Sequence, residues 1–352
     1  MLYIDPYKNI AIRLLMCCWC LGGIGLSTVQ AQDPHFSQFY NSPLTLNPAI
    51  TGLMNDDIRI IANYRSQWGA VATPFRTMAL SADVSAFRDY LDDDVLGFGL
   101  LLMNDKAGQS ELRNTQVQLS LGYSKALNDD ANNYISIGGQ AGFVQSRMNV
   151  LGLLFENQFD GGALNSGLPS GEDIVFAGVN YWDVSAGIAW AYTPDRFNSY
   201  YLGTALFHIN QPRVSFMENS EELLHTKTTV YGGMELRANY NMSLLPRAVV
   251  LLQGPSREVN IGVLAKFNFG NVNGYDDITA LYVGTMHRFK DAQVIITRLD
   301  YGPLGISFSY DINISSLSNA SKGHGAAELA VMYKSSLFQP NRRRDPVMCP
   351  AF

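Results

Sequence analysis

Apolar and polar residues alternate along most of this chain with a period of two, which is the pattern of β-strands. Near position 120, for example, Val117, Leu119 and Leu121 share one phase, whereas Gln118 and Ser120 share the other. The pattern predicts an all-β protein of about fourteen strands. The predicted runs are 58–67, 76–86, 95–104, 112–126, 134–145, 178–192, 199–210, 227–240, 244–253, 257–269, 277–288, 291–299, 302–312 and 325–335.

The connectors between these runs differ in length, depending on whether they follow an odd-numbered or an even-numbered run. The long polar connectors 146–177, 211–226 and 313–324 follow odd-numbered runs, whereas even-numbered runs are followed by short turns such as 128–130. A transmembrane barrel has short periplasmic turns on one rim and longer extracellular loops on the other. We therefore predict an antiparallel outer-membrane β-barrel of about fourteen strands at 58–335. A soluble sandwich or propeller with the apolar phase inward is the alternative, and it leaves the one-sided loops unexplained.

The first residues are typical of a secretory signal peptide. Lys8 and Arg13 precede the apolar stretch 14–26, and 29–31 reads as a small-residue cleavage site, so we expect a signal peptide at 1–31. Apolar residues make up 47% of the chain and charged residues only 16%, against about a quarter in soluble proteins. The surface is therefore expected to face lipid in part, as an integral protein of the outer membrane.

Two polar segments flank the predicted barrel. The extension 32–57 contains three X-Pro pairs, which exclude a central strand, and the tail 336–352 follows the last run. Because an even number of strands returns the chain to the same rim, both segments are expected on the periplasmic side. We expect the extension to pack across the periplasmic mouth. In the tail, the basic run 342–344 and Cys349 have no assigned role.

Charged residues in the inward phase of the strands are balanced in sign, because five basic residues, which include Lys334, stand against five acidic ones. Balanced charges in a lumen favour a structural network of ion pairs, because a selective pore carries rings of one sign. A polar path for small solutes or for a peptide remains the alternative. The predicted lumen network comprises Arg59, Arg65, Asp83, Asp183, Glu235, Arg237, Lys266, Asp311 and Glu328.

The sequence offers little chemistry of other kinds. The five histidines are scattered without zinc spacing, and no nucleophile, base and oxyanion donors converge on one segment, so we expect no catalytic residue, no metal and no cofactor. The net charge of −6 is acidic, whereas a nucleic-acid-binding protein usually has an excess of basic residues, so we expect no nucleic-acid partner. Gly97 and Gly99 lie within a strand pattern, where they indicate a packing feature or a bulge rather than a phosphate loop.

A series of short motifs resembles one family in order along the whole mature chain, the PorP/SprF proteins of type IX secretion in the Bacteroidetes. The opening block is the most specific of them. The motifs are Gln32-Asp33-Pro34-His35-Phe36-Ser37-Gln38-Phe39-Tyr40, Leu46-Asn47-Pro48-Ala49-Ile50-Thr51-Gly52, Tyr64-Arg65-Ser66-Gln67-Trp68, Asn104-Asp105-Lys106-Ala107-Gly108, Gly178-Val179-Asn180-Tyr181-Trp182, Asn210-Gln211-Pro212, Ser309-Tyr310-Asp311 and Cys349-Pro350-Ala351-Phe352. Ala351 departs from the family, in which a basic residue is expected between the terminal Pro and Phe.

The resemblance implies an outer-membrane component of the type IX machine that acts as adaptor or anchor in export and surface attachment of a cargo protein with a C-terminal sorting domain. It also implies contact with the periplasmic ring and a link to gliding motility. A barrel transporter for small or hydrophobic solutes, with the extension as a hatch, is the alternative, and an enzyme is not expected. The residues that we expect to bind partners are Asp33, Pro34, Phe36, Gln38, Tyr40, Asn47 and Pro48.

Overall fold

The computed structural model describes residues 33–69, 73–87, 91, 93–108, 111–149, 156–160, 163–165, 167–169, 171, 178–195, 197–216, 222–269, 279–316 and 318–336. The expected signal peptide and nearly all of the tail lie outside these residues. The chain divides between Asp33 and Pro34 into two compact units, and the second unit contains all of the elements described here.

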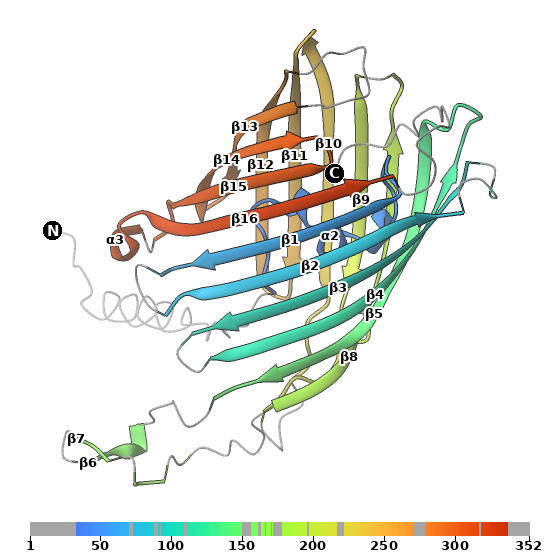
Figure 1. Cartoon of the computed structure of the whole chain (residues 1–352). Coiled ribbons are helices and arrows are strands. Elements are labelled where there is room, and N and C mark those ends of the chain that lie inside the picture. Colours follow the sequence, from blue (N-terminus) through green and yellow to red (C-terminus); the bar gives the residue numbers. More distant parts are fainter. Residues whose placement is uncertain are drawn as a thin grey trace, which may run out of the picture. The chain divides into compact units, whose positions relative to one another are not determined.

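Fourteen antiparallel strands close into a barrel in which each strand pairs with its neighbours in chain order and β1 pairs with β16 (Figure 1). This confirms the predicted fold class. The strands are β1 (Ile58–Gln67), β2 (Phe75–Ala86), β3 (Val95–Ala107), β4 (Leu112–Ala126), β5 (Asn133–Arg147), β8 (Gly178–Tyr192), β9 (Ser199–Phe207), β10 (Lys227–Asn239), β11 (Met242–Gln253), β12 (Ser256–Asn268), β13 (Thr279–Arg288), β14 (Ala292–Tyr301), β15 (Leu304–Asn313) and β16 (His324–Ser335).

Short elements complete the described structure. Before β1 lie the 3₁₀-helix η1 (Phe39–Asn41), the α-helix α2 (Pro43–Leu46) and the 3₁₀-helix η2 (Pro48–Ile50). Between β5 and β8 lie η4 (Glu156–Gln158) and a two-stranded sheet of β6 (Phe159–Asp160) and β7 (Ala163–Leu164), and α3 (Ser318–Ser321) lies between β15 and β16. In the described part of the chain, no helix has the length and apolar content needed to cross a membrane.

The apolar phase of the strands faces outward. On β4, Leu119 is 66% exposed and its neighbour Gln118 is 3% exposed, and on β15 Phe308 is exposed whereas Ser309 is buried. A soluble sandwich would bury the apolar phase, so this arrangement excludes that alternative and fits a barrel surrounded by lipid. The register keeps the phases together across strands, since outward Leu102, Val117 and Phe143 are successive partners on β3, β4 and β5.

The two rims differ mainly in their longest connectors. We define the long-loop rim as the end that carries the connectors 148–177 and 208–226, and the short-turn rim as the opposite end. The expected difference does not hold for every connector. The two-residue turn 254–255 lies on the long-loop rim, and the longer connector 269–278 lies on the short-turn rim.

Candidate functional site

The extension before β1 lies inside the barrel rather than across its mouth, which corrects our expectation. Figure 1 shows its blue elements, including α2, between the near and far walls of the barrel. Leu44, Ala49, Ile50 and Leu53 have no exposed surface. Ala49, Ile50 and Leu53 share one hydrophobic core with apolar side chains on the inner face of the wall, which include Leu245, Val249, Leu264, Met286, Val294 and Ile296. Leu44 belongs to a second cluster with Ala79, Leu101 and Met103 of the wall. The described chain thereby has a core inside the lumen.

The extension runs through the lumen from the long-loop rim to the short-turn rim. Near its start, Ser37 is bound by Asp311 and Glu328, which lie close to the long-loop ends of β15 and β16. At its end, the backbone N–H of Asp57 donates to the carbonyl of Ser335, the last residue of β16, at the short-turn rim. The segment that we expected on the periplasmic side therefore begins near the opposite end of the barrel. We call residues 34–57 the lumen segment.

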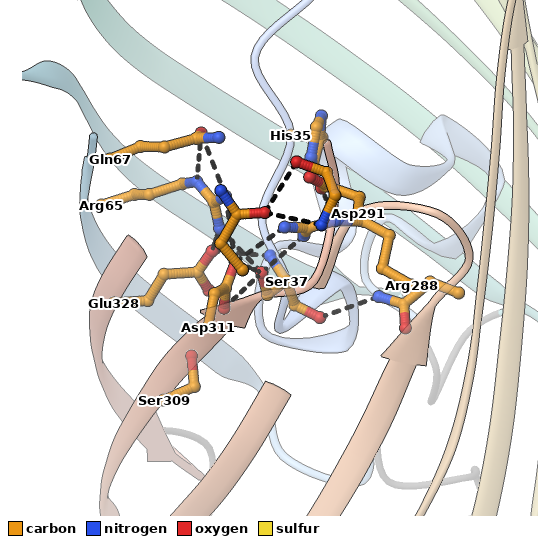
Figure 2. Close-up of polar contacts among 12 residues, drawn as sticks. His35, Ser37, Arg65, Gln67, Arg288, Asp291, Ser309, Asp311 and Glu328 are labelled. Carbon is orange, nitrogen blue, oxygen red and sulfur yellow. Dashed lines mark hydrogen bonds and ion pairs between the residues drawn. The ribbon is translucent and has the colours of Figure 1, made fainter. Parts of the chain in front are cut away.

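A charged cluster of Ser37, Arg65, Arg288, Asp311 and Glu328 holds the start of the lumen segment (Figure 2). The Ser37 hydroxyl donates to Asp311 over 2.8 Å and accepts from Arg65 over 2.7 Å and from Arg288 over 2.8 Å. A hydroxyl has one proton and two lone pairs, so this set of partners satisfies it completely. We refer to these five residues as the Ser37 cluster.

The cluster is neutral and buried. Arg65 pairs with Glu328 and, over 3.2 Å, with Asp311, and Arg288 pairs with Asp311 over 2.8 Å. Glu328 also accepts the backbone N–H groups of Ser37 (2.6 Å) and of the next residue (3.1 Å). Two arginines and two carboxylates cancel in charge, and each is hydrogen-bonded, which is the condition for keeping ionised groups out of water. The wall thus binds the backbone as well as the side chain of the segment.

Amide side chains fix the lumen segment at two further points. Gln38 donates to Ser309 over 2.9 Å and accepts from Asn41 over 2.8 Å. Deeper in the barrel, the Asn47 amide nitrogen lies 2.9 Å from the carbonyl of Ile188 and 3.1 Å from the Tyr231 hydroxyl. The Asn47 side-chain oxygen accepts the N–H of the second residue of η2 over 2.8 Å, so one side chain both caps the helix and ties it to the wall.

A row of glycines on neighbouring strands lets the segment approach the wall closely. A Cβ added at Gly97 would overlap the Thr51 carbonyl, at Gly138 the Pro48 carbonyl, and at Gly187 the Asn47 side chain. Gly122 of β4 faces the same turn of the segment. Gly97, which the sequence marked as a packing feature, belongs to this row. We call Gly97, Gly122, Gly138 and Gly187 the glycine seat.

One aromatic side chain of the lumen segment is buried against a wall arginine. Tyr40 is 2% exposed, and the Arg247 guanidinium lies 4.1 Å from the centre of its ring. Tyr40 therefore contributes a cation–π contact to a wall arginine.

The remaining predicted lumen charges are paired in three groups, with one exception. Arg59 bonds to Asp83 over 2.7 Å, Lys266 bonds to Glu235 over 2.9 Å, and Asp183 contacts His208 over 2.8 Å. Asp83 also accepts the N–H of Gly52 of the lumen segment over 2.9 Å. The exception, Arg237, lies at the short-turn rim, where its guanidinium is 3.6 Å from the Phe197 ring centre and donates to two backbone carbonyls.

The sequence prediction missed several wall residues that contact the lumen segment. Arg288 is a member of the Ser37 cluster, Arg298 donates to Asn41 over 3.1 Å, and Glu258 contacts His35 over 3.2 Å. Arg288 ends a predicted strand, and its inward phase was available from the alternation. Its partner on the segment was not, because 251 positions separate Arg288 from Ser37.

Most of the residues expected to bind partners are buried in this structure. Phe36, Gln38, Tyr40, Asn47 and Pro48 lie within the barrel, and Asp33 and Pro34 are partly exposed. In the described chain their contacts are therefore largely with the barrel wall. Partner binding by these residues stays a prediction.

A closed barrel with an apolar outer face and buried ion pairs inside defines this chain as an outer-membrane β-barrel protein, here with its own N-terminal segment in the lumen. The chain belongs to the family described as type IX secretion system membrane protein PorP/SprF, which its residues 28–333 match. Membership of this family, together with the fold, indicates an outer-membrane component of the type IX secretion system.

Solved structures with a similar fold include the toluene transporter TbuX of Ralstonia pickettii, with 12% identity over 84% of this chain and 93% of that chain, and a TM-score of 0.48. Others are the CymD monoaromatic hydrocarbon channel (12% identity, 90% and 96% coverage, TM-score 0.47) and a FadL homologue of Pseudomonas aeruginosa (11%, 82% and 92%, TM-score 0.40). No curated protein matches this sequence.

Proposed function

We propose that this protein is an adaptor or anchor of the type IX machine and does not conduct its cargo through its own lumen. The observation that carries the proposal is the lumen segment, which spans the barrel between its rims and is bonded to the wall at the Ser37 cluster, at Asn47 and at Asp83. A fourteen-stranded barrel is too narrow for a folded domain even when it is empty, since porins of about 16 to 18 strands pass only small solutes.

The rims are then the surfaces left for partners. We infer that the connectors 148–177, 208–226 and 314–323 on the long-loop rim hold a secreted cargo protein with a C-terminal sorting domain. The tail 337–352 would contact the periplasmic ring of the machine from the short-turn rim, and through that ring the protein would support gliding motility. In this proposal the chain performs no catalytic step.

A pull-down of the tagged protein from its native outer membrane in mild detergent, followed by mass spectrometry, tests the proposal. We expect type IX ring subunits together with a secreted protein that carries a C-terminal sorting domain. Two variants separate the rims. Shortening 148–177 should release the cargo and keep the ring subunits, and removing 337–352 should release the ring subunits and keep the cargo.

A barrel recovered without these partners would contradict the adaptor proposal. The transporter alternative would then gain weight, with the lumen segment as a movable hatch. It predicts conductance in planar bilayers, or solute uptake in cells that lack the secretion machine. Equal recovery of both partner classes by the wild-type protein and both variants would contradict the assignment of cargo and ring to opposite rims.

A further inference from the structure

Four basic residues form one continuous row on the outer face of the barrel, at the ends of β2 to β5 that lie nearest the long-loop rim. In the strand register Arg76 is the partner of Lys106, Lys106 is the partner of Arg113, and Arg113 is the partner of Arg147. Each has the outward phase, and the three arginines are exposed. We call these four residues the basic row.

The basic row has an excess of positive charge. Neighbouring strands lie about 4.8 Å apart, so the row spans roughly 14 Å, and like charges directly opposite each other destabilise a sheet. Within the described part of the chain, the acid that bonds to the row is Glu111, which lies 2.7 Å from Lys106 and is half exposed. An external anion would therefore relieve the repulsion among the arginines. The planar guanidinium group of an arginine can donate two parallel hydrogen bonds to two oxygens of one phosphate.

Hydrogen-bonding side chains lie directly below the basic row on the same outward face. Asn104 donates to Thr115 over 2.8 Å, and Gln145 donates to Asn180 over 3.0 Å. Thr115 and Gln145 are themselves register partners, so these side chains form a second row one outward position nearer the middle of the barrel. This row offers amide and hydroxyl groups at the level where charge gives way to apolar surface.

An apolar groove of about 480 Å³ begins at this second row and continues toward the middle of the membrane-facing surface. Asn104 and Thr115 border it, and Ala62 lies within it, where its small side chain leaves space between larger neighbours. The other groove residues on the outward phase are Tyr64, Met78, Leu80, Leu102, Leu329 and Val331.

We propose that this face binds a lipid whose headgroup carries more than one phosphate, with the phosphates on the basic row and an acyl chain in the groove. The surface matches the parts of such a lipid in order. The basic row would bind the phosphates, the amide side chains would bind the polar sugar or glycerol part, and the apolar groove would hold an acyl chain. Long loops mark the outer side of a transmembrane barrel, so the ligand comes from the outer leaflet. The inference is independent of the adaptor function.

Native mass spectrometry of the full-length protein in an uncharged detergent, titrated with diphosphoryl lipid A, tests the proposal. We expect the triple variant R76A/R113A/R147A to bind this lipid at least roughly tenfold more weakly than the wild type, since each tenfold corresponds to about one lost charge-assisted contact. R257A is the matched control, because Arg257 is an exposed outward cation at the same rim whose register partner is Leu252. It should bind like the wild type.

Two further measurements examine the ligand and the groove. Lipid A without phosphates should bind the wild type as weakly as diphosphoryl lipid A binds the triple variant. Ala62→Phe, which fills the groove from an exposed position, should weaken binding of the acylated lipid and leave binding of the deacylated bisphosphorylated disaccharide unchanged. Heat-modifiable migration on gels verifies that each variant is folded.

Equal affinity of the wild type and the triple variant, or an equal loss in R257A, would overturn the role of the basic row. If inorganic phosphate competed as well as the lipid at the same concentration, the site would be an anion site and the lipid assignment would be wrong. If Ala62→Phe bound the acylated lipid normally, the groove would play no part in binding.

Discussion

The glycine seat predicts that one added methyl group displaces the lumen segment. In Gly138→Ala, the new Cβ would overlap the Pro48 carbonyl and lie 2.6 Å from the Cα of Ala49. Both atoms belong to the backbone of the segment, so the clash is relieved by movement of η2 rather than by rotation of a side chain. Overpacking of this kind costs about 1–3 kcal/mol, which raises the population of the displaced segment roughly 5- to 150-fold.

Gly139→Ala is a matched control at the next position. Gly139 has the outward phase, and a Cβ there would lie 3.9 Å from its nearest neighbour, the Ser185 carbonyl oxygen, which is an ordinary contact. The two variants have the same composition and differ only in the face that carries the methyl group. A difference between them therefore reports on the lumen and not on the strand.

Conductance in planar bilayers and protease cleavage of the lumen segment measure the displacement. Gly138→Ala should show a higher open probability and faster cleavage than wild type, whereas Gly139→Ala should match the wild type in both. Gly122→Ala, whose Cβ would lie 2.7 Å from the Thr51 carbonyl oxygen, provides a second variant should Gly138→Ala fail to fold. If the variants of Gly138 and Gly122 both behaved like Gly139→Ala, close packing on the glycine seat would not hold the segment.

Two further predictions concern the polar contacts of the lumen segment. Glu328→Gln removes one of the two negative charges of the Ser37 cluster and breaks its buried pair with Arg65. Breaking a buried pair typically costs about 3–5 kcal/mol. The variant barrel should therefore unfold, as followed by its heat-modifiable mobility on gels, at a lower temperature than the wild type. Glu111→Gln, at an exposed pair, should shift this temperature little, and an equal shift would refute the argument. Asn47→Ala leaves wall and segment groups without partners at a cost of about 1–3 kcal/mol, which should appear as faster proteolysis of the lumen segment. Cleavage at the wild-type rate would show that the glycine seat suffices.

The strands were predictable from the sequence because their chemistry alternates locally. The run 178–192 was predicted with the bounds that β8 has in the structure, and the expected outward phase of Leu119 is observed. Strand ends next to polar loops were less certain, since 199–210 ends at Phe207 in the structure. Lipid on the outer side keeps the outward phase apolar, so little tertiary information is needed to place the strands. The alternation weakens where the inward phase is also apolar, as at Val294 and Ile296 of β14.

The position of the lumen segment was not predictable in the same way. Its X-Pro pairs correctly excluded a strand, but the rim at which it begins depends on contacts such as that of Ser37 with Glu328, 291 positions away. The basic row has the same origin, because Arg76 and Arg147 are brought onto one line only by the register of four strands. Contacts of this kind leave no local pattern.

The seam between the first and last strands has a consequence for the order of assembly. Arg65 of β1 and Glu328 of β16 are register partners across this seam, and both bind Ser37. A contact between the two ends of the chain forms late in folding, because the entropy cost of closing a long loop comes before the free energy gained from the contact. The lumen segment must therefore be inside when β1 meets β16, and a barrel that closed without it would leave the paired charges of its own seam without the serine that joins them.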